Sequence, residues 1–312
     1  AEEVGRPLEI VVLAGRAVPG GRARSREIGG FVIEEGPNGF LDSEAALGHL
    51  IKAAGLEDDV IRANAEAARR YLLKDGRPRE LKPHPLHFAR SGILSPLGLG
   101  RLLLEPLIPK GPGDETESIA AFAKRRLGGE ARDRLMDPIV SGVFAGDPKA
   151  LSLIHAFPRI AALEAAHGSL IRGAISTQRA RKSKALPGPS GALTSFKGGV
   201  ARFPQALAER GDFEIRYGAR VLDIARGAEG GFDLRIDGAG ASLHADGVIL
   251  GGEAYSMAKV VEALSPSLSQ ALGSLVFPPL NVGALGYGPE AQGRVPPGFG
   301  LLAPKVERAS LL

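Results

Sequence analysis

Residues 19–42 read PGGRARSREIGGFVIEEGPNGFLD, and the rest of the sequence is organised around this stretch. A strand predicted over residues 8–13 leads into Gly20-Gly21-Arg22, and a second strand, predicted over residues 31–34, leads into Gly36-Pro37-Asn38-Gly39. Glycine lets a backbone approach a ligand closely because no Cβ intervenes, and an arginine presents a fixed fork of donors that suits a phosphate. The two loops therefore predict a nucleotide cradle, with a pair of ordinary surface turns as the alternative.

Length and composition indicate a globular protein of more than one domain. The chain has 312 residues, which exceeds the size at which a single hydrophobic core usually stops growing. Hydrophobic residues make up 44% and charged residues 24%, and the 43 glycines predict many tight turns. The net charge of +4 is small and aromatic residues amount to 5%, so no nucleic-acid partner is expected.

Several kinds of site are excluded or disfavoured by residue type. The chain has no cysteine, which rules out disulfides, thiolate metal sites and cysteine nucleophiles within it. Its six histidines show no His-x-x-x-His spacing, so no metal site is expected. Residues 93–108 form the most apolar stretch, but Arg101, Glu105 and two prolines make it a poor candidate for crossing a bilayer.

Both ends of the sequence have the pattern expected where a longer chain is cut within a domain. The start, AEEVGRP, has no signal-peptide character and resembles the last turn of a helix that leads into a strand. A G-x-G-x-x-G phosphate turn is expected upstream of such a start. The last residues, GFGLLAPKVERASLL, stop without a helix-ending signal, so we expect an internal part of a longer protein that also lacks a C-terminal portion.

Periodicity and turn signals predict the order of elements. Helices are predicted over residues 43–55, 115–127, 131–140, 157–172 with an extension towards 181, 203–210 and 254–264. Strands are predicted over residues 70–73, 79–81, 214–217, 219–226, 231–237, 247–250, 280–287 and 299–302. Residues 182–193 are rich in Pro, Gly and Ser and predict a linker. Strands at both ends with helices between them predict a split α/β domain that carries a mainly helical insertion.

Five collinear motifs give the chain a family resemblance. The most specific is SGVFAGD at residues 141–147, which is followed by LS, FP and GSLI at 151–152, 157–158 and 168–171. The others are GGRARS, GPNGFLD, RYLLKDGRPRELKP and LTSFKGGVARFPQAL. With these motifs the chain resembles the bacterial protoporphyrinogen oxidases of the FAD-dependent, flavin amine oxidase-like superfamily over nearly its whole length.

The resemblance implies a fold and its division along the chain. The expected fold is α/β, with a split FAD-binding Rossmann-like domain, a β-rich substrate region and an inserted, mainly helical, membrane-docking subdomain. Residues 1–82 would form the first FAD-binding part with the start of the substrate region, and residues 83–185 the helical insertion. Residues 186–265 would form the second FAD-binding part, and residues 266–312 the first of further substrate-domain strands.

FAD is the cofactor that the resemblance implies, and its contacts can be matched position by position. Arg22, after Gly20 and Gly21, matches a residue that touches the cofactor phosphates. Gly36-Pro37-Asn38-Gly39 match the loop along the flavin, and Val221 matches the residue whose backbone meets the adenine.

Two positions in the cofactor region depart from the expected pattern. Ala14 stands where dinucleotide folds place an acidic residue that binds the ribose hydroxyls. Leu250-Gly251-Gly252-Glu253 stands where the family has a run of small residues that ends in proline.

The implied substrate is a porphyrinogen with propionate arms. Arg70 matches an arginine that holds one propionate, which is physically sensible because a guanidinium binds a carboxylate bidentately; an ordinary surface cation is the alternative. Gly142, Val143 and Phe144 match the segment that lines the slot for the flat macrocycle. Leu301 is a candidate for the apolar wall of that slot.

The implied chemistry is hydride transfer from a methylene bridge of the macrocycle to the flavin. Dioxygen is the oxidant that regenerates the oxidised flavin. No side chain is expected to act as a catalytic base. The resemblance further implies a cytoplasmic protein, peripheral on the inner face of the cell membrane, and a homodimer. The leucines of residues 93–108 would enter one leaflet while Arg101 and Lys110 meet head groups, with ordinary helix packing as the alternative.

Several functions stay open at this level. The first is oxidation of protoporphyrinogen IX to protoporphyrin IX in heme biosynthesis, and the second is oxidation of the four-propionate coproporphyrinogen III to coproporphyrin. A flavin oxidase of amines or carotenoids would need an aromatic pair facing the flavin, for which four tyrosines and no tryptophan offer little. A non-catalytic membrane-surface or scaffold relative is the remaining alternative, which the absence of bound flavin would indicate.

Overall fold

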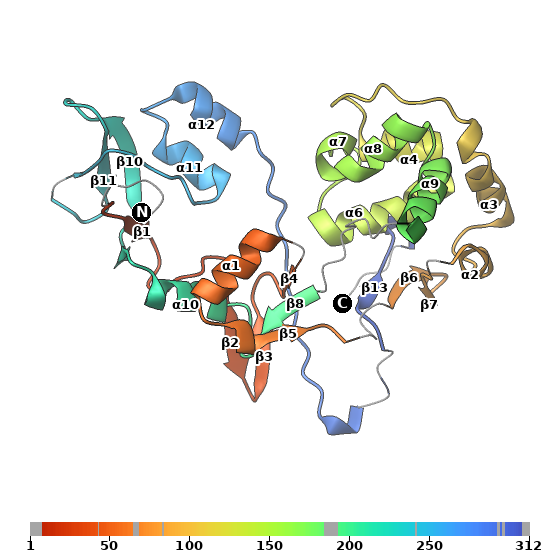
Figure 1. Cartoon of the computed structure of the whole chain (residues 1–312), viewed down its shortest axis with the longest axis horizontal. Coiled ribbons are helices and arrows are strands. Elements are labelled where there is room, and N and C mark those ends of the chain that lie inside the picture. Colours follow the sequence, from red (N-terminus) through yellow and green to blue (C-terminus); the bar gives the residue numbers. More distant parts are fainter. Residues whose placement is uncertain are drawn as a thin grey trace. The chain divides into compact units, whose positions relative to one another are not determined.

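The structure is a computed structural model that describes residues 8–42, 44–64, 69–82, 84–183, 193–240, 242–291, 294 and 297–307 (Figure 1). The chain divides into two compact units. Unit 1 comprises Ala1–Arg62, Gly191–Phe277 and Asn281–Gly286, and unit 2 comprises Ala63–Ser190, Pro278–Leu280 and Tyr287–Leu312. Each unit contains helices and strands, so the expected mixed α/β class is confirmed.

Unit 1 contains a parallel pair of strands from opposite ends of the chain. β1 (Val11–Ala14) pairs in parallel with β9 (Glu214–Tyr217), and Ala14 lies opposite Tyr217. Parallel neighbours require a long connection, because the chain must return to the same end of the sheet before the second strand begins. Here that connection includes the whole of the helical segment of unit 2.

Unit 1 also contains an antiparallel sheet, whose core includes a residue of β1. β10 (Val221–Arg226), β11 (Phe232–Ile236) and β12 (Leu243–Ala245) follow one another in the sheet. Ile224, Leu234 and Val260 are its buried centre, and Leu13 of β1 packs against them. Val260 ends α11 (Ala254–Val260), which lies beside α12 (Pro266–Gly273), a helix that the sequence analysis missed (Figure 1).

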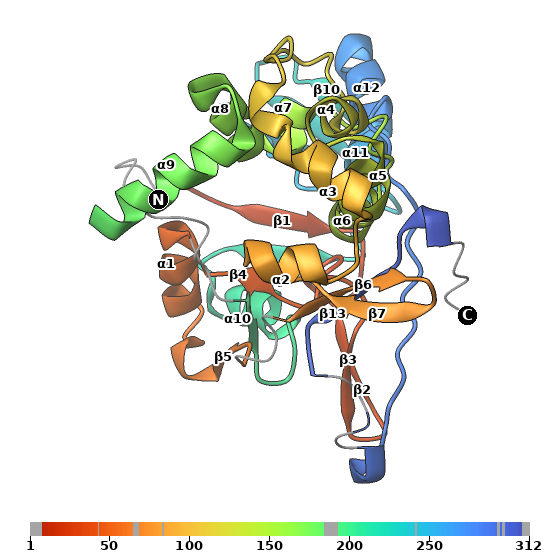
Figure 2. The ribbon, with the colours of Figure 1, turned by 90° about the vertical axis from the view of Figure 1, so that its right-hand side faces the viewer.

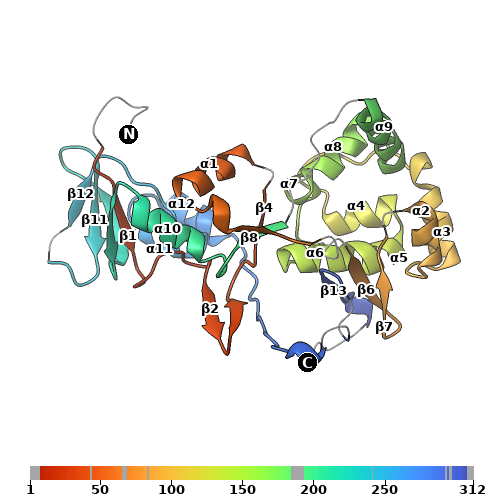
Figure 3. The same ribbon diagram turned by 60° about the horizontal axis from the view of Figure 1, so that its bottom comes forward.

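Residues 19–42 contain a β-hairpin. β2 (Ser25–Ile28) pairs antiparallel with β3 (Phe31–Glu34) through Gly29 and Gly30. Both glycines have positive φ, 59° and 80°, as a two-residue hairpin turn requires. β3 matches the prediction, whereas β2 was missed because its residues, SREI, carry no apolar alternation. The hairpin extends away from the other elements of unit 1 (Figures 2 and 3).

A second small sheet of unit 1 lies between two helices. β8 (Leu193–Phe196) has β4 (Phe40–Leu41) on one side and β5 (Val60–Arg62) on the other. α1 (Ala45–Ala53) and α10 (Arg202–Arg210) contribute Ile51 and Ala206 to a core that includes Phe196. Both helices were predicted. Ser43, the first residue of the predicted helix 43–55, lies outside the described residues.

Unit 2 has a three-stranded sheet. β6 (Arg70–Lys74) and β7 (Arg77–Glu80) form the predicted hairpin, which turns at Asp75 and Gly76 with φ of 52° and 68°. β13 (Gly300–Leu302) pairs in parallel with β6 and confirms the strand predicted near residue 300. α6 (Asp137–Phe144) lies beside β13 (Figure 3).

Helices make up the rest of unit 2. They are α2 (Pro85–Arg90), α3 (Pro96–Leu103), η3 (Glu105–Leu107), α4 (Ile119–Arg126), α5 (Gly129–Ala131), the π-helix η4 (Arg132–Met136), α6 (Asp137–Phe144), α7 (Leu153–Ala156), α8 (Pro158–His167) and α9 (Leu170–Ser183). Ser95 and Ser118 cap α3 and α4 by accepting hydrogen bonds from the backbone nitrogens of Gly98 and Ala121. The predicted helix over residues 115–127 starts later than expected because Ser118 is its cap. Short 3-10 turns occur at η1 (Glu57–Asp59), η5 (Pro289–Ala291) and η6 (Lys305–Glu307).

Three predictions of secondary structure were wrong. The helix predicted from residue 157 towards 181 is two helices, because Gly168 adopts a left-handed conformation (φ 67°) that ends α8. Residues 247–250 form no strand: β12 takes the edge of the sheet before them, and Ile249 is 97% exposed. The described residues 280–287 are extended but form no ladder with another strand. Most of the predicted linker, residues 184–192, lies outside the described part of the chain.

A buried cluster of charges joins four helical elements of unit 2. Arg126 at the end of α4 is fully buried, and its Nη1 donates to Oε1 of Glu105 on η3 at 3.1 Å. Its Nε donates to Oε1 of Glu164 on α8 at 2.6 Å. The other oxygen of Glu105 accepts from the hydroxyl of Ser169 at 2.5 Å, and its Oε1 accepts from the first backbone nitrogen of α9. Each buried charge in this cluster is therefore stabilised by its partners of opposite sign.

We expect Arg126→Met to destabilise unit 2 by about 3–5 kcal/mol, because it leaves the fully buried carboxylate of Glu105 without its cation, whereas Glu164 keeps its pair with Arg125. Urea unfolding followed by circular dichroism measures the change. Arg159→Met is the control, since Arg159 is an exposed arginine on α8, and it should change stability by less than about 0.5 kcal/mol. Equal stability of the two variants would show that the cluster does not hold the unit together.

Candidate functional site

The two predicted loops of unit 1 meet in the structure. A Cβ at Gly36 would overlap the carbonyl oxygen of Arg22, so the two backbones are in direct contact. The nitrogen of Glu35 donates to the carbonyl of Arg24 at 2.8 Å, and that of Ala23 donates to Gly20 at 2.8 Å. Gly36 therefore permits an approach that a residue with a side chain would prevent.

Gly39 makes a similar contact at the other end of its loop. A Cβ there would lie 2.6 Å from the carbonyl oxygen of Thr194 on β8. Pro37 and Asn38 lie between the two glycines and are exposed. The Gly36–Gly39 loop is thus anchored by backbone at both ends and presents its middle to solvent.

Glu34 and Ser25, which the sequence did not indicate as site residues, bind a third loop, at residues 199–201, to the β2–β3 hairpin. Oε1 of Glu34 accepts from the backbone nitrogen of Val200 at 2.9 Å, and Oγ of Ser25 accepts from that of Ala201 at 3.0 Å. Ser25 also donates to Glu34 at 2.6 Å. Gly199 (φ 98°) packs against Ser25, so the KGG motif at residues 197–199 was the available sequence signal.

Arg22 carries the exposed positive charge of these loops. Its Nε donates to Oε1 of Glu253 at 2.8 Å and its Nη2 donates to the hydroxyl of Tyr255 at 2.9 Å. The hydrogen bond from Arg22 lowers the pKa of the Glu253 carboxyl, and the bonds to Glu253 and Tyr255 raise the pKa of Arg22. Because two-thirds of the side chain is exposed, the pair is accessible to a competing anion.

The remaining predicted cofactor residues lie close together in unit 1. Gly15 follows Ala14 at the end of β1, and a Cβ at Gly15 would lie 3.8 Å from Cβ of Arg220. Val221 comes next in the chain and begins β10, opposite Ile236. The end of the parallel pair therefore lies beside the start of the antiparallel sheet.

The loops of unit 1 fit a dinucleotide in their chemistry. Arg22 supplies a guanidinium, Gly21 (φ 55°) has no neighbouring atom within 4 Å of a hypothetical Cβ, and Gly36 and Gly39 let their loop lie against neighbouring backbone. Such backbone-lined, cationic loops suit phosphate groups. The carboxylate of Glu253 beside Arg22 is a feature that opposes an anion.

In unit 2, strand pairing brings Arg70 close to the other predicted substrate residues. Gly300 lies opposite Arg70 and Leu302 lies opposite Leu72 in the β6–β13 pair. Side chains alternate between the two faces of a sheet, so Arg70, Leu72 and Leu302 share one face. Leu302 contacts Gly142: a Cβ at Gly142 would lie 2.6 Å from its Cδ2. Arg70 and Gly142 are therefore linked through one sheet face.

The other predicted substrate residues are apolar and partly exposed. Val143 and Phe144 end α6, where Ala145 adopts a left-handed conformation (φ 49°). The ring of Phe144 packs edge-on against Phe157, with 5.4 Å between centroids. Leu301 pairs with Tyr71 and lies on the opposite face of the sheet from Leu302.

Arg70 has an aromatic neighbour that the sequence analysis did not name. Its guanidinium carbon lies 5.7 Å from the ring centroid of Phe299, and the nitrogen of Phe299 donates to the carbonyl of Arg69 at 2.8 Å. Among the described residues, no carboxylate pairs with Arg70. The guanidinium is exposed and available to an anionic group.

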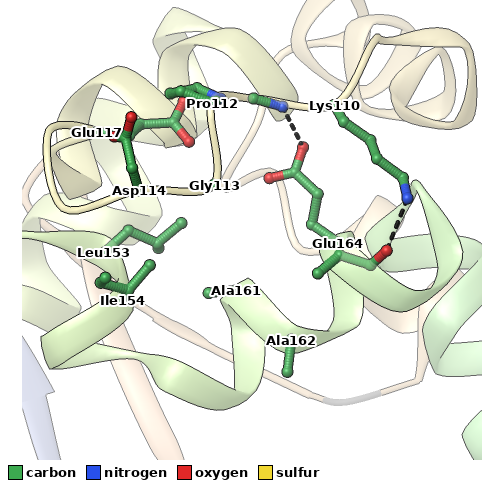
Figure 4. Close-up of a pocket in the computed structure, with 12 residues that line it drawn as sticks. Lys110, Pro112, Gly113, Asp114, Glu117, Leu153, Ile154, Ala161, Ala162 and Glu164 are labelled. Atoms are coloured by element: carbon green, nitrogen blue, oxygen red, sulfur yellow. Dashed lines mark hydrogen bonds between the residues drawn. The ribbon is translucent and has the colours of Figure 1, made fainter.

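Unit 2 also contains a pocket of about 400 Å³ that lies apart from these residues (Figure 4). Glu164 points towards the loop at Lys110 and Gly111, where its Oε1 accepts from the nitrogen of Gly111 at 3.2 Å. Leu153, Ile154 and Ala161 form its apolar side. Arg70, Gly142 and Leu301 are not among the described residues that line it.

The apolar segment at residues 93–108 exposes leucines, whereas its basic residues are engaged. Leu97 on α3 is 88% exposed, and Leu103 and Leu107 are exposed to a similar degree. Arg101 donates to the carbonyls of Arg125 and Arg126, and Lys110 donates to the carbonyl of Ala165 at 2.7 Å. These cations therefore bind helix ends in this structure, and their predicted contact with head groups stays a prediction. In the part of the chain that the structure describes, no helix is long and apolar enough to cross a bilayer.

Comparison with known proteins assigns the family. The chain belongs to the family described as flavin containing amine oxidoreductase, whose sequence profile matches residues 4–305. The chloroplastic protoporphyrinogen oxidase of Nicotiana tabacum is 30% identical over 97% of this chain and 58% of its own length. The coproporphyrinogen III oxidase of Staphylococcus aureus is 30% identical over 70% of this chain and 46% of its own length. The resemblance expected from the five motifs is confirmed.

The fold has relatives among solved structures. The crystal structure of a protein from Exiguobacterium sp. 255-15 superposes with a TM-score of 0.68 at 23% identity, over 86% of this chain and 59% of that one. At this identity the likeness shows the fold. The chain spans somewhat more than half the length of the first relatives it matches.

The contact between Gly36 and Arg22 leads to a test with a matched control. Gly36→Ala should lower the free energy of unfolding by about 1–3 kcal/mol, because the added methyl group must push two backbones apart. Gly48→Ala should raise it by about 0.5–1 kcal/mol, since Gly48 lies in α1 with no neighbour within 4 Å. Thermal unfolding of both variants checks the opposite signs, and a neutral effect of Gly36→Ala would contradict the close contact.

Proposed function

We propose that the protein is a flavin-dependent porphyrinogen oxidase, which oxidises protoporphyrinogen IX to protoporphyrin IX with FAD and dioxygen in heme biosynthesis. Membership of a flavin-containing family and the similarity to protoporphyrinogen oxidases support this proposal. Oxidation of coproporphyrinogen III is the alternative, favoured by the similarity to coproporphyrinogen III oxidases of Staphylococcus aureus and Bacillus subtilis.

The observation that carries the proposal is the contact of Gly142 on α6 with Leu302, which lies on the same face of the β6–β13 sheet as Arg70. A porphyrinogen is a largely apolar macrocycle with carboxylate arms at its edge. Its recognition needs an apolar surface without projecting side chains and a cation at the margin. Gly142 of α6, which packs against the apolar Leu302 of β13, and the exposed guanidinium of Arg70 on β6 support these two needs within unit 2.

Each part of the chain then has a distinct role. In unit 1, Arg22 and the Gly36–Gly39 loop would hold the phosphates and the ring system of FAD. When bound, the flavin supplies the hydride-accepting chemistry. In unit 2, Arg70 would orient the substrate through one propionate, while Val143 and Phe144 would exclude water from the ring face.

Arg70→Ala should raise the KM for protoporphyrinogen IX by roughly ten- to a hundredfold, because it removes a charge-assisted pair with a propionate. We expect a smaller change in kcat. The assay follows porphyrin fluorescence with the full-length protein and is repeated with coproporphyrinogen III to decide between the two substrates.

Arg77→Ala is the matched control for this assay, because Arg77 is an exposed arginine of the same hairpin near its turn. Its KM should equal that of the unchanged protein. Equal KM values for the Arg70 and Arg77 variants would exclude a propionate contact at Arg70. No oxidation of either porphyrinogen would overturn the proposed function as a whole.

The exposed leucines of α3 and η3 support a proposed peripheral contact with a membrane surface. Leu97, Leu103 and Leu107 could enter the acyl boundary of one leaflet, as interfacial segments do. Because Arg101 and Lys110 donate to backbone carbonyls, this contact would depend on apolar burial and little on anionic lipid.

Replacing Leu97, Leu103 and Leu107 together by serine should weaken co-sedimentation with phosphatidylcholine vesicles at least tenfold, since each buried leucine contributes about 1.5–3 kcal/mol. Raising the salt concentration should change the binding of the unchanged protein little. Leu268→Ser on α12 is the control, because this leucine is also exposed but lies in unit 1. Vesicle binding that survives the triple substitution would rule out the leucines as the contact.

A further inference from the structure

The pair between Arg22 and Glu253 joins the nucleotide loop to a segment 231 residues away in the sequence. Glu253 ends the Leu250-Gly251-Gly252-Glu253 run, one of the two departures from the family pattern in the cofactor region. It precedes α11 but makes no side-chain cap to that helix, so its carboxylate is free to serve Arg22.

Tyr255 reinforces the pair from a fixed position. Its hydroxyl accepts from Nη2 of Arg22 at 2.9 Å, and its ring packs edge-on against Phe277 with 5.2 Å between centroids. The hydroxyl is therefore placed by ring packing as well as by the arginine. Two of the three guanidinium nitrogens of Arg22 thus face acceptors of this chain.

We propose that Glu253 acts as an internal counter-anion that a dinucleotide phosphate must displace from Arg22, so that Glu253 weakens the binding of the flavin cofactor. The inference rests on the proposed function for the identity of that cofactor. Glu253 is on this view an affinity-determining residue beside the phosphate site, with no part in the oxidation itself.

The physical argument is competition for one set of donors. A guanidinium edge that donates to a carboxylate and a hydroxyl cannot donate to a phosphate through the same hydrogens. A phosphate that binds the Nε–Nη2 edge of Arg22 must therefore break the bonds to Glu253 and Tyr255. The displaced carboxylate would then lie near a second anion, and like charges in proximity repel.

The expected size follows from the exposure of the pair. Arg22 is largely exposed and Glu253 about one-third exposed, so solvent screens their attraction. Exposed pairs of this kind change an equilibrium up to about fivefold, and the repulsion between carboxylate and phosphate adds to this. Removing the charge of Glu253 should therefore tighten FAD binding roughly three- to tenfold.

The test measures binding rather than turnover. FAD is titrated into the full-length apoprotein, and quenching of flavin fluorescence gives the Kd. Glu253→Gln keeps the shape of the side chain and removes its charge, so the Kd should fall roughly three- to tenfold. Tyr255→Phe removes one acceptor but keeps the ring on Phe277, and the Kd should fall by about twofold.

Glu214→Gln is the matched control. Glu214 forms an exposed pair with Arg216, 2.8 Å between Nε and Oε1, on β9 of the same unit. This variant changes net charge by the same amount as Glu253→Gln, so the Kd should stay that of the unchanged protein. A similar tightening in both variants would mean that overall charge, and not the pair with Arg22, sets the affinity.

The remaining outcomes separate this inference from the proposed function. The inference is overturned if the Kd of the unchanged protein for FAD equals that of Glu253→Gln or lies below it. Glu253 would then be neutral or would position Arg22 for the phosphate. The proposed flavin-dependent function would stand in that case. No FAD bound by any variant overturns both.

Discussion

The backbone contact between Arg22 and Gly36 is the constraint on which unit 1 depends. It exists because position 36 has no side chain, so the loop after β1 and the loop after β3 can lie against each other. The β2–β3 hairpin supplies the rigid link between the two loops, and its turn at Gly29 and Gly30 sets their register. Once the loops meet, the side chain of Arg22 is directed to the segment at Glu253 and Tyr255.

Glu34 and Ser25 extend this arrangement to a third segment. Their side chains accept from the backbone nitrogens of Val200 and Ala201, just before α10 begins. Nitrogens at the start of a helix have no partner within the helix, so these bonds stabilise α10 as well as the hairpin. A single polar pair thus ties together sequence segments that lie on either side of the helical insertion.

Unit 2 also joins segments that are distant in the sequence, but through different interactions. Its sheet joins β6 to β13, and Leu302 of β13 meets Gly142 at the end of α6. Among the helices of unit 2, the buried charges of Arg126, Glu105 and Glu164 hold four helical elements in one arrangement. Burial alone would raise the pKa of Glu164, but the hydrogen bonds from Arg125 and Arg126 outweigh it and lower that pKa. The proposed substrate face therefore lies on a unit whose interior contains, beside its apolar clusters, a specifically paired group of charges.

The sequence by itself determined the elements whose signals are local. Asp75 and Gly76 marked a hairpin, apolar spacing marked α1 and α10, and the motifs at residues 141–147 marked the family. Only the tertiary structure decided that residues 247–250 have no strand partner, that Arg126 is buried, and that Glu253 faces Arg22. The physical reason is that periodicity and turn chemistry act over a few neighbouring residues. Pairing between distant segments depends instead on how whole elements pack, and no short stretch of the sequence contains that information.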